Sequence, residues 1–356
     1  MSTNAEVVIS AIGMVSSVGI GAAPTCAAVR AGITRFVEFD DYCCTLNGEP
    51  RPGRPPPEPQ PVVGALAGFA ERPPDVVPRM FLTALQDMVK SAGLRRSALA
   101  RIPVFVSLPA DLGAARDARL VEGFLGDVQE RSGTTFAPGS AVLTRGHAGM
   151  FVAVGQALSA IARREREACV VAGVESYFEI GTLERLDREG RLKSQANLDA
   201  FIPGECAVAV LLERRDEAER RGGAALAVVG APGYGVEPSP LGSNDPSTAV
   251  GLTDAIRGAC ASAPGPMEWV LCDLNGESYR ANEWARTRVR LHDQLGGVKH
   301  LWHPADCLGD VGASTGGVLL ALAAKAFERG YALASRALLF VASDDGTRAA
   351  LTIAAA

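Results

Sequence analysis

One structural unit occurs twice in this chain, with its parts in the same order. In the first copy, small residues at 146–149 precede a run whose apolar residues share one helix face, and the strand Cys169–Glu175 follows. In the second copy, small residues at 309–317 precede the run Val318–Phe327, and the strand Ala337–Ala342 follows. Because the second run is apolar on nearly all sides, it predicts a helix that is covered on every side by other elements.

The strands that precede these units repeat as well. The corresponding segments are Glu6–Gly13 and Ile102–Leu108 in the first half, and Ala224–Gly230 and Trp269–Leu274 in the second half. Alternation of strands and helices is typical of an α/β layered fold. We therefore predict two pseudo-symmetric halves, residues 1–222 and 223–356, which are joined by the charged segment Glu213–Gly223.

A proline-rich segment interrupts the first half, from Phe36 to about Pro74. Nine prolines occur there, among them those at positions 52, 55, 56, 57, 59 and 61. Proline has no backbone N–H and is excluded from helix interiors and central strands. We expect this segment, residues 36–74, to be a long excursion on the surface and one candidate for contact with a partner.

Charge, hydropathy and cysteine usage exclude several classes of protein. A net charge of −5 argues against a nucleic-acid-binding surface. No basic start and apolar segment of the secretory type is present, and the longest apolar run is interrupted by Lys325 and too short to span a membrane. The eight cysteines form no CxxC pair and are expected to be reduced and mostly buried. These features predict a cytoplasmic protein that binds neither membrane nor nucleic acid.

A metal site is suggested only by His300, His303 and Asp306, which are spaced by three residues. Pro304 interrupts any helix that would align them, and no fourth ligand has a suitable spacing. The glycine-rich stretches also lack the GxGxxG and P-loop patterns of nucleotide sites. We therefore predict no metal and no cofactor.

Four motifs, taken in order, resemble those of the β-ketoacyl carrier-protein synthases of the thiolase superfamily. They are Val7–Gly19, Ala172–Glu175, Phe201–Ala207 with Cys206 in place of a glycine, and Asp345–Ala349. The resemblance implies a thiolase-like five-layer α-β-α-β-α fold made of two pseudo-symmetric halves. It also implies a homodimer, in which the strand near Ala141–Arg145 pairs across the two-fold axis.

The same resemblance implies a catalytic cysteine and two histidines, and this sequence replaces all three. His147 stands where the nucleophilic cysteine belongs, just before the first buried helix, and Asn275 stands in place of the first histidine. Either Asp306 or Asp310 replaces the second histidine, and the register with Asp310 is favoured.

Two further polar segments belong to the same predicted site. The gate near the C-terminus, which carries a phenylalanine in the family, reads Ser343-Asp344 here. Asn275 is followed by Gly276 and Glu277, and then by Tyr279, Arg280 and Asn282. These polar residues could line a new pocket, or Asn275 and Gly276 could simply form a turn. We take Glu277, Ser343 and Asp344, with Asp306 in the alternative register, as candidate binding residues.

These replacements make condensation improbable. The reaction needs a thiolate, which a helix N-terminus stabilises, and donors for an oxyanion and an enolate. An imidazole at a helix N-terminus is expected to be neutral and to form poor acyl intermediates, and ionised carboxylates would repel an enolate. Buried carboxylates are also an unfavourable lining for an acyl tunnel.

The leading hypothesis is therefore a catalytically degenerate ketosynthase-like protein that binds rather than catalyses, as an adaptor, a scaffold or the silent partner of an active synthase. Its partners would be a second copy, a client protein, an intact synthase or an acyl carrier protein. The alternative is an atypical acyltransferase or thioester hydrolase that uses His147 with Asp310 and Asn275. A binder that keeps the thioester pocket without the reaction is a third hypothesis.

Overall fold

The computed structural model describes residues 6–38, 62–64, 66, 75–110, 114–261 and 263–356. The strands of the first half are β1 (Val7–Ser16), β5 (Val104–Leu108), β6 (Ala141–Thr144), β7 (Ala168–Ser176) and β8 (Glu205–Arg214). Those of the second half are β9 (Ala227–Val229), β10 (Gly233–Val236), β11 (Trp269–Cys272), β12 (His300–Trp302), β13 (Arg336–Ala342) and β14 (Thr347–Ala354). Short strands β2 (Gly19–Ile20), β3 (Val37–Glu38) and β4 (Val62–Val63) lie outside this pattern.

The helices are α1 (Ala22–Arg30), α2 (Val76–Ser91), α3 (Ala114–Ser132), α4 (Gly149–Ala162), α5 (Ile180–Arg188), α6 (Arg215–Arg220), α7 (Val250–Cys260), α8 (Ser278–Arg290), α9 (His292–Leu295), α10 (Ala305–Leu308) and α11 (Thr315–Glu328). Most of the proline-rich segment 36–74 lies outside the described residues, so its predicted role as a surface excursion stays a prediction. In the described part, no helix is both long and apolar enough to cross a membrane.

The two halves have the same strand topology. The strand order is β6-β5-β7-β8-β1 in the first half and β12-β11-β13-β14-β9 in the second, and β9 pairs with both β1 and β14. In each half the first three strands of that order are parallel, and the next two are antiparallel to their neighbours. The predicted repeat therefore corresponds to a repeated arrangement of strands, and the proposed division at residues 222 and 223 falls between α6 and β9.

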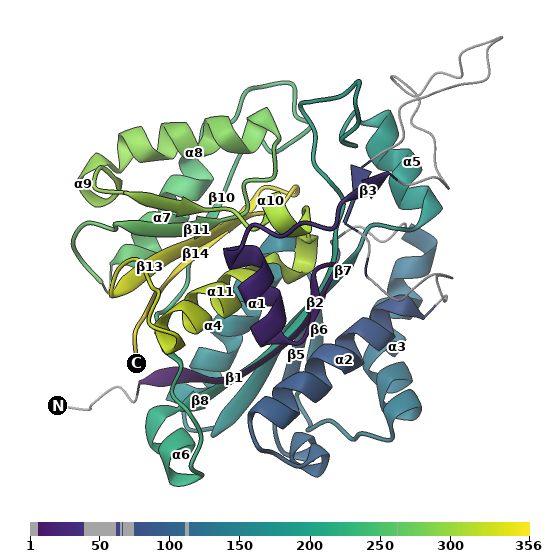
Figure 1. Ribbon diagram of the computed structural model, residues 1–356, viewed down its shortest axis with the longest axis vertical. Coiled ribbons are helices and arrows are strands. Elements are labelled where there is room, and N and C mark those ends of the chain that lie inside the picture. The colour runs from purple at the N-terminus through teal and green to yellow at the C-terminus, as the bar shows by residue number, and fades with distance from the viewer. Residues whose placement is uncertain (1–5, 39–61, 65, 67–74, 111–113, 262) are drawn as a thin grey trace.

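The helices and strands form five stacked layers, and the two buried helices make up the middle layer (Figure 1). Helices α4 and α11 lie in the middle, within one hydrophobic cluster that includes the inner faces of both sets of strands. Helices α2 and α3 cover the outer face of the first set, and α7 and α8 cover the outer face of the second. This arrangement confirms the predicted five-layer α-β-α-β-α fold.

Close packing of α4 against α11 depends on small residues. Residues Thr315 to Ala326 of α11 are all buried, as the apolar run predicted. A Cβ atom at Gly316 would lie 2.9 Å from the Cβ of Met150, and one at Gly317 would lie 2.8 Å from its Cε. Glycine therefore lets the first turns of the two helices approach each other, and the polar residues that precede both helices are brought together.

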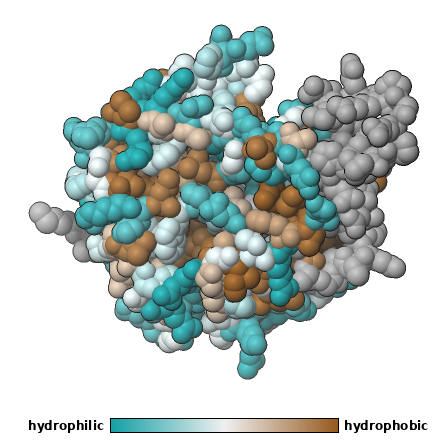
Figure 2. All heavy atoms as spheres, turned by 45° about the horizontal axis from the view of Figure 1, so that its top comes forward, coloured by the Kyte–Doolittle hydropathy of each residue, from teal (hydrophilic) through white to brown (hydrophobic). Residues whose placement is uncertain are grey.

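The outer surface carries no single dominant apolar region on the face that Figure 2 presents. Hydrophobic side chains lie there in several patches, and hydrophilic side chains separate them. Scattered apolar residues of this kind are normal on protein surfaces and indicate no binding site.

Candidate functional site

The site lies where the chain enters the two buried helices. His147 belongs to the 3-10 turn Gly146–Ala148 before α4, and Asp310 precedes the 3-10 turn Gly312–Ser314 before α11. The loop after β11 contributes Asn275 and Glu277, and the turn between β13 and β14 contributes Asp344. The structure thus brings together five residues that the sequence predicted for one site.

Asp310 is the centre of this cluster. Its Oδ1 accepts hydrogen bonds from the backbone N–H of Gly312 at 2.8 Å and from the hydroxyl of Tyr177 at 3.2 Å, and it lies 2.8 Å from Nε2 of His147. Its Oδ2 accepts a hydrogen bond of 2.7 Å from the side-chain amide of Asn275. Burial alone would raise the pKa of Asp310, but His147, Arg280 and the Asn275 bond outweigh it and hold that pKa far below the ordinary value.

His147 forms a buried ion pair with Asp310. The side chains are only 5% and 2% exposed. Burial disfavours the charged imidazole, and Arg280 opposes it too, but the carboxylate of Asp310 prevails and raises the pKa of His147 above its ordinary value. The expectation of a neutral imidazole considered the helix N-terminus without the carboxylate beside it, and this carboxylate favours the charged form.

Arg280, at the start of α8, is a second buried cation of the site. Its Nη1 donates to Oδ2 of Asp273 at 2.6 Å and to the carbonyl oxygen of Ala342 at 2.5 Å, and its Nη2 donates to Oδ1 of Asp344 at 3.2 Å. The same Nη2 lies 3.5 Å from Nε2 of His147. Asp273 and Asp344 therefore balance the charge of a guanidinium that would otherwise destabilise the imidazolium.

Arg191 lies on the outer side of the cluster and pairs with two acids. Its Nε and Nη2 donate to the carboxylate of Glu277 at 2.7 and 3.0 Å, and its Nη1 donates to Oδ2 of Asp344 at 2.7 Å. Arg191 and Arg280 lower the pKa of Asp344 to about 2, against the effect of its partial burial. Glu277 also accepts a bond of 2.9 Å from the Asn275 amide, so the predicted polar cluster is part of a continuous network.

Ser343 connects the gate segment to the turn that carries His147. Its hydroxyl donates to the carbonyl oxygen of Arg145 at 2.6 Å and accepts a hydrogen bond of 2.9 Å from the N–H of Ala148. The hydroxyl proton is thus directed at a backbone carbonyl rather than at His147. Ser343 holds the turn in place and is not oriented as a nucleophile.

Asp306 lies away from this cluster. It belongs to the short helix α10, its side chain is 71% exposed, and its Oδ2 lies 2.9 Å from Nδ1 of His303. Pro304 directly precedes α10, and the structure places Asp310 beside His147 and Asp306 outside the site. Among the described residues, no group of His, Cys, Asp and Glu could hold a metal ion.

No cysteine in the described part of the chain has a thiol that is activated for nucleophilic chemistry. Six free cysteines are buried there: Cys26, Cys169, Cys206, Cys260, Cys272 and Cys307. Burial raises the pKa of each thiol, to about 12 for Cys26, Cys169 and Cys206. A catalytic thiol needs the opposite shift, so none of these six is equipped to accept an acyl group.

Three residues of the network were not predicted as site residues: Asp273, Arg191 and Tyr177. Asp273 flanks the predicted cluster at Asn275, and a buried acid after a strand was a signal that could have identified it. Arg191 lies in a segment without any motif. Its contacts depend on the way the two halves pack, which no local pattern encodes.

The ion pair predicts a specific dependence of stability on pH. The raised pKa of His147 means that its stabilising contribution is complete below the ordinary imidazole value of 6.5 and is lost as the pH rises through the folded-state pKa. The lowered pKa of Asp310 means that its contribution is complete above 3.8 and is lost in acid.

We therefore expect the stability difference between the wild type and His147→Gln to be largest between these values and to shrink above pH 6.5. The decrease should be about 1.4 kcal/mol for each unit that separates the folded and unfolded pKa of His147. Urea unfolding at several pH values measures this difference. A difference that does not change with pH would show that His147 is not charged in the folded protein.

Comparison with known proteins agrees with this fold. A family model for the N-terminal domain of β-ketoacyl synthases matches residues 137–218, the part that carries His147, α4, β7 and β8. None of the curated proteins matches the sequence.

Many solved structures have the same fold, and the following three are distant in sequence. The oxazolomycin ketosynthase domain OzmH KS7 of Streptomyces albus JA3453 is 19% identical, with a TM-score of 0.77 over 99% of this chain and 74% of that chain. The ishigamide ketosynthase/chain length factor is 16% identical, with a TM-score of 0.77 over 99% of this chain and 100% of that chain.

A third structure is the complex AntDE:AntF, an acyl-carrier protein with its ketosynthase bound to the hexaketide. It is 13% identical, with a TM-score of 0.79 over 99% of this chain and 100% of that chain. These likenesses establish the thiolase-like ketosynthase fold.

Proposed function

We propose that this chain, which has the ketosynthase fold, is a catalytically degenerate ketosynthase-like protein that acts through binding to another thiolase-fold chain. One observation carries the proposal: His147 and Asp310 are held as a buried ion pair at the position where the resemblance implies catalytic residues. A protonated imidazole has no lone pair for an acyl group, and an ionised carboxylate repels an enolate.

The remaining members of the site support this proposal. The amide of Asn275 donates to Asp310 and Glu277, so it is engaged within the protein rather than directed at a ligand. Arg280 is neutralised by Asp273 and Asp344. Most donors and acceptors of this buried network are engaged with one another, Nε of Arg280 excepted, so the network stabilises the fold and leaves few groups to stabilise a transition state.

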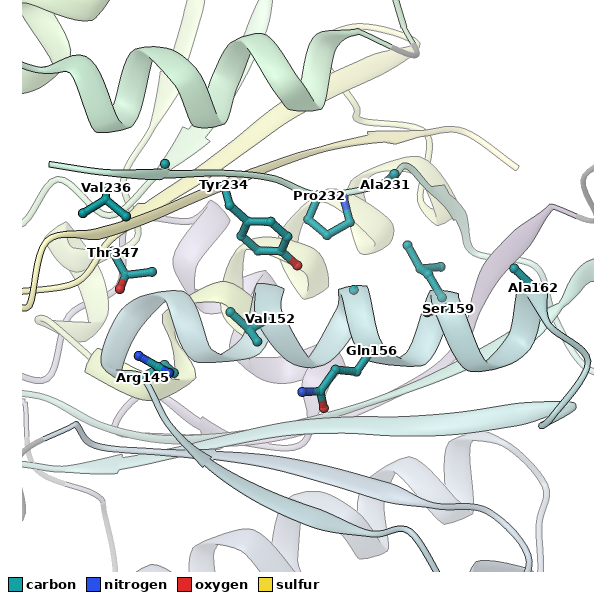
Figure 3. A pocket seen from close by; sticks show the side chains of 13 residues that line it. Arg145, Val152, Gln156, Ser159, Ala162, Ala231, Pro232, Tyr234, Val236 and Thr347 are labelled. Carbon is teal, nitrogen blue, oxygen red and sulfur yellow. The ribbon is translucent and has the colours of Figure 1, made fainter.

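The surface proposed for binding lies along α4. Strand β6 ends the strand order and leaves one edge unpaired among the described strands. Beside it, α4 and β10 form a groove of about 910 Å³, with Val152 and Ala162 on one wall and Pro232, Tyr234 and Val236 on the other (Figure 3). The side chains of Tyr234 and Val236 are 46% and 72% exposed.

A second copy of this chain is the occupant that we propose. An open edge strand can be extended by an equivalent strand of another chain, and the adjoining groove would add apolar contact area to that interface. Two of the similar structures are themselves described as a ketosynthase with a second protein, a chain length factor or an acyl-carrier protein. An intact synthase would use the same surface if the protein is a silent partner.

Val236→Asp tests this surface. A carboxylate in the groove should weaken self-association at least about a hundredfold, because an apolar interface centre does not tolerate an unpaired charge. Val289→Asp is the matched control, since Val289 is 79% exposed on α8 outside the groove. Sedimentation analysis over a range of concentrations gives the association constant. A monomeric wild type, or equal effects of both variants, would contradict the proposed dimer.

The second candidate function is a thioester hydrolase or atypical acyltransferase. The contact of 2.8 Å between His147 and Asp310 favours it, because a catalytic base needs a partner that orients it. The two functions are distinguished by thioester hydrolysis, which only the enzyme would lose in His147→Ala.

A further inference from the structure

We infer that residues 180–200 form a lid over the buried ion pair, and that Arg191 is the latch that holds this lid closed. The lid comprises α5 and the loop that follows it, and Figure 1 shows α5 at the edge of the molecule, outside the stacked layers. The inference deepens the proposed function by naming what controls access to its site, and it rests on that proposal only for the role of the site.

The lid packs on a small hydrophobic cluster of its own. Leu183, Leu186, Leu192 and Phe201 form this cluster, and Tyr177 packs against it. It is separate from the three larger clusters that hold the layers together. A segment with a separate cluster can move as a unit at a lower free-energy cost than the main core.

Both ends of the lid are anchored beside Asp310. At the first end, the hydroxyl of Tyr177 donates to Oδ1 of Asp310. At the second end, the N–H of Asp310 donates to the carbonyl oxygen of Ile202 at 2.7 Å, and the N–H of Gly204 donates to the carbonyl oxygen of Asp310 at 2.8 Å. These anchors fix where the lid can pivot, and any displacement of the lid is transmitted to the contacts of Asp310.

Arg191 ties the lid to the second half of the protein. Its guanidinium donates two hydrogen bonds to Glu277, the residue that directly precedes α8, and one to Asp344, in the turn between β13 and β14. The side chain of Arg191 is 11% exposed and also lies over the ring of Phe201, at 5.1 Å from the ring centroid. One further tie is the bond of 2.7 Å from the N–H of Ser278 to Oδ1 of Asp199.

The latch covers the network from outside. Glu277 accepts a bond from Asn275, and Asn275 in turn donates to Asp310. When Arg191 releases Glu277 and Asp344, these acids lose a shared counter-ion, and water reaches the His147–Asp310 pair. A partner or ligand that offers Arg191 another anion would therefore open the site.

The rate of thiol labelling tests the latch. In the His147→Cys background, iodoacetamide reports access to position 147, and mass mapping of the peptide separates this thiol from the native cysteines. Adding Arg191→Met should increase the labelling rate about tenfold or more, because charge-assisted hydrogen bonds to two acids are lost. Arg188→Met is the matched control, since Arg188 is an exposed arginine of the same lid, at the end of α5.

Hydrogen exchange in the chain with His147 intact provides a second readout. We expect Arg191→Met to accelerate exchange in peptides of the lid and of residues 146–150, with the outer helices α2 and α7 unchanged. Asp344→Asn, which removes only the more exposed partner, should give a smaller change in the same peptides. This variant keeps the test decisive if Arg191→Met does not fold.

The latch would be overturned if His147→Cys is labelled at the same rate with and without Arg191→Met, and if hydrogen exchange in the lid peptides is unchanged by Arg191→Met. That result would leave the proposed function intact, because the latter depends on the charge state of the pair. Thioester turnover by the wild type would instead contradict the proposed function and leave the latch as the gate of an active site.

Discussion

Replacing Asp310 by alanine should lower the free energy of unfolding by about 3–5 kcal/mol, since removal of one member of a buried ion pair leaves the other without compensation. The imidazolium of His147, the amide of Asn275, the hydroxyl of Tyr177 and the N–H of Gly312 all lose their common acceptor. Chemical denaturation at about pH 6 measures the loss while the pair is charged.

Two control variants separate charge from hydrogen bonding at this position. Asp310→Asn keeps an acceptor oxygen and should cost less than Asp310→Ala, because a neutral His147 can still bond to the amide. Asp306→Ala removes an exposed aspartate only four residues away and should change stability by no more than about 0.5 kcal/mol. If Asp310→Ala is as mild as Asp306→Ala, the buried pair does not exist as described.

The second large effect concerns Arg348, which follows the turn that contains Ser343 and Asp344. Arg348 and Glu283 are each 1% exposed, and Nε of the arginine donates to both carboxylate oxygens at 2.9 and 3.1 Å. Arg348 also donates to the carbonyl oxygen of Ser343 and the hydroxyl of Tyr279. Arg348→Ala should cost about 3–5 kcal/mol, because it leaves a buried carboxylate unpaired.

The double variant Arg348→Met, Glu283→Gln is the control for this pair. It removes both charges and retains most of the volume, so it should recover a large part of the lost stability. Burial already raises the pKa of Glu283 above its ordinary value, so the loss in Arg348→Ala should be smaller in mild acid, where the carboxyl becomes neutral. A double variant as unstable as Arg348→Ala would show that packing, rather than charge, accounts for the effect.

The fold was predictable because its determinants are local and repeated. The run Val318–Phe327 is apolar on nearly all sides, which favours a helix in a central layer, as α11 shows. The paired segments Ile102–Leu108 and Trp269–Leu274 contain β5 and β11, which occupy equivalent places in the two strand orders. The repeat therefore indicated the layers before any contact was known.

The members of the site were easier to predict than their chemistry. The motifs indicated His147, Asn275 and Asp310, and in the structure His147 and Asn275 both lie within hydrogen-bond distance of Asp310. Their charge state depends on Arg280 and on exclusion of water, which follow from packing between the halves. Likewise, the choice between Asp306 and Asp310 depends on the direction that the chain takes after Pro304, which spacing alone does not determine.

The central claim is that the ion pair of His147 and Asp310 has replaced acyl-transfer chemistry. Intact-protein mass after incubation with acetyl and long-chain acyl coenzyme A, with thioester hydrolysis followed in the same samples, tests it most directly. We predict neither adduct nor turnover in the wild type, because the imidazolium has no lone pair to offer. An acyl adduct or turnover in the wild type that disappears in His147→Ala would contradict the claim and establish an acyl-transfer enzyme.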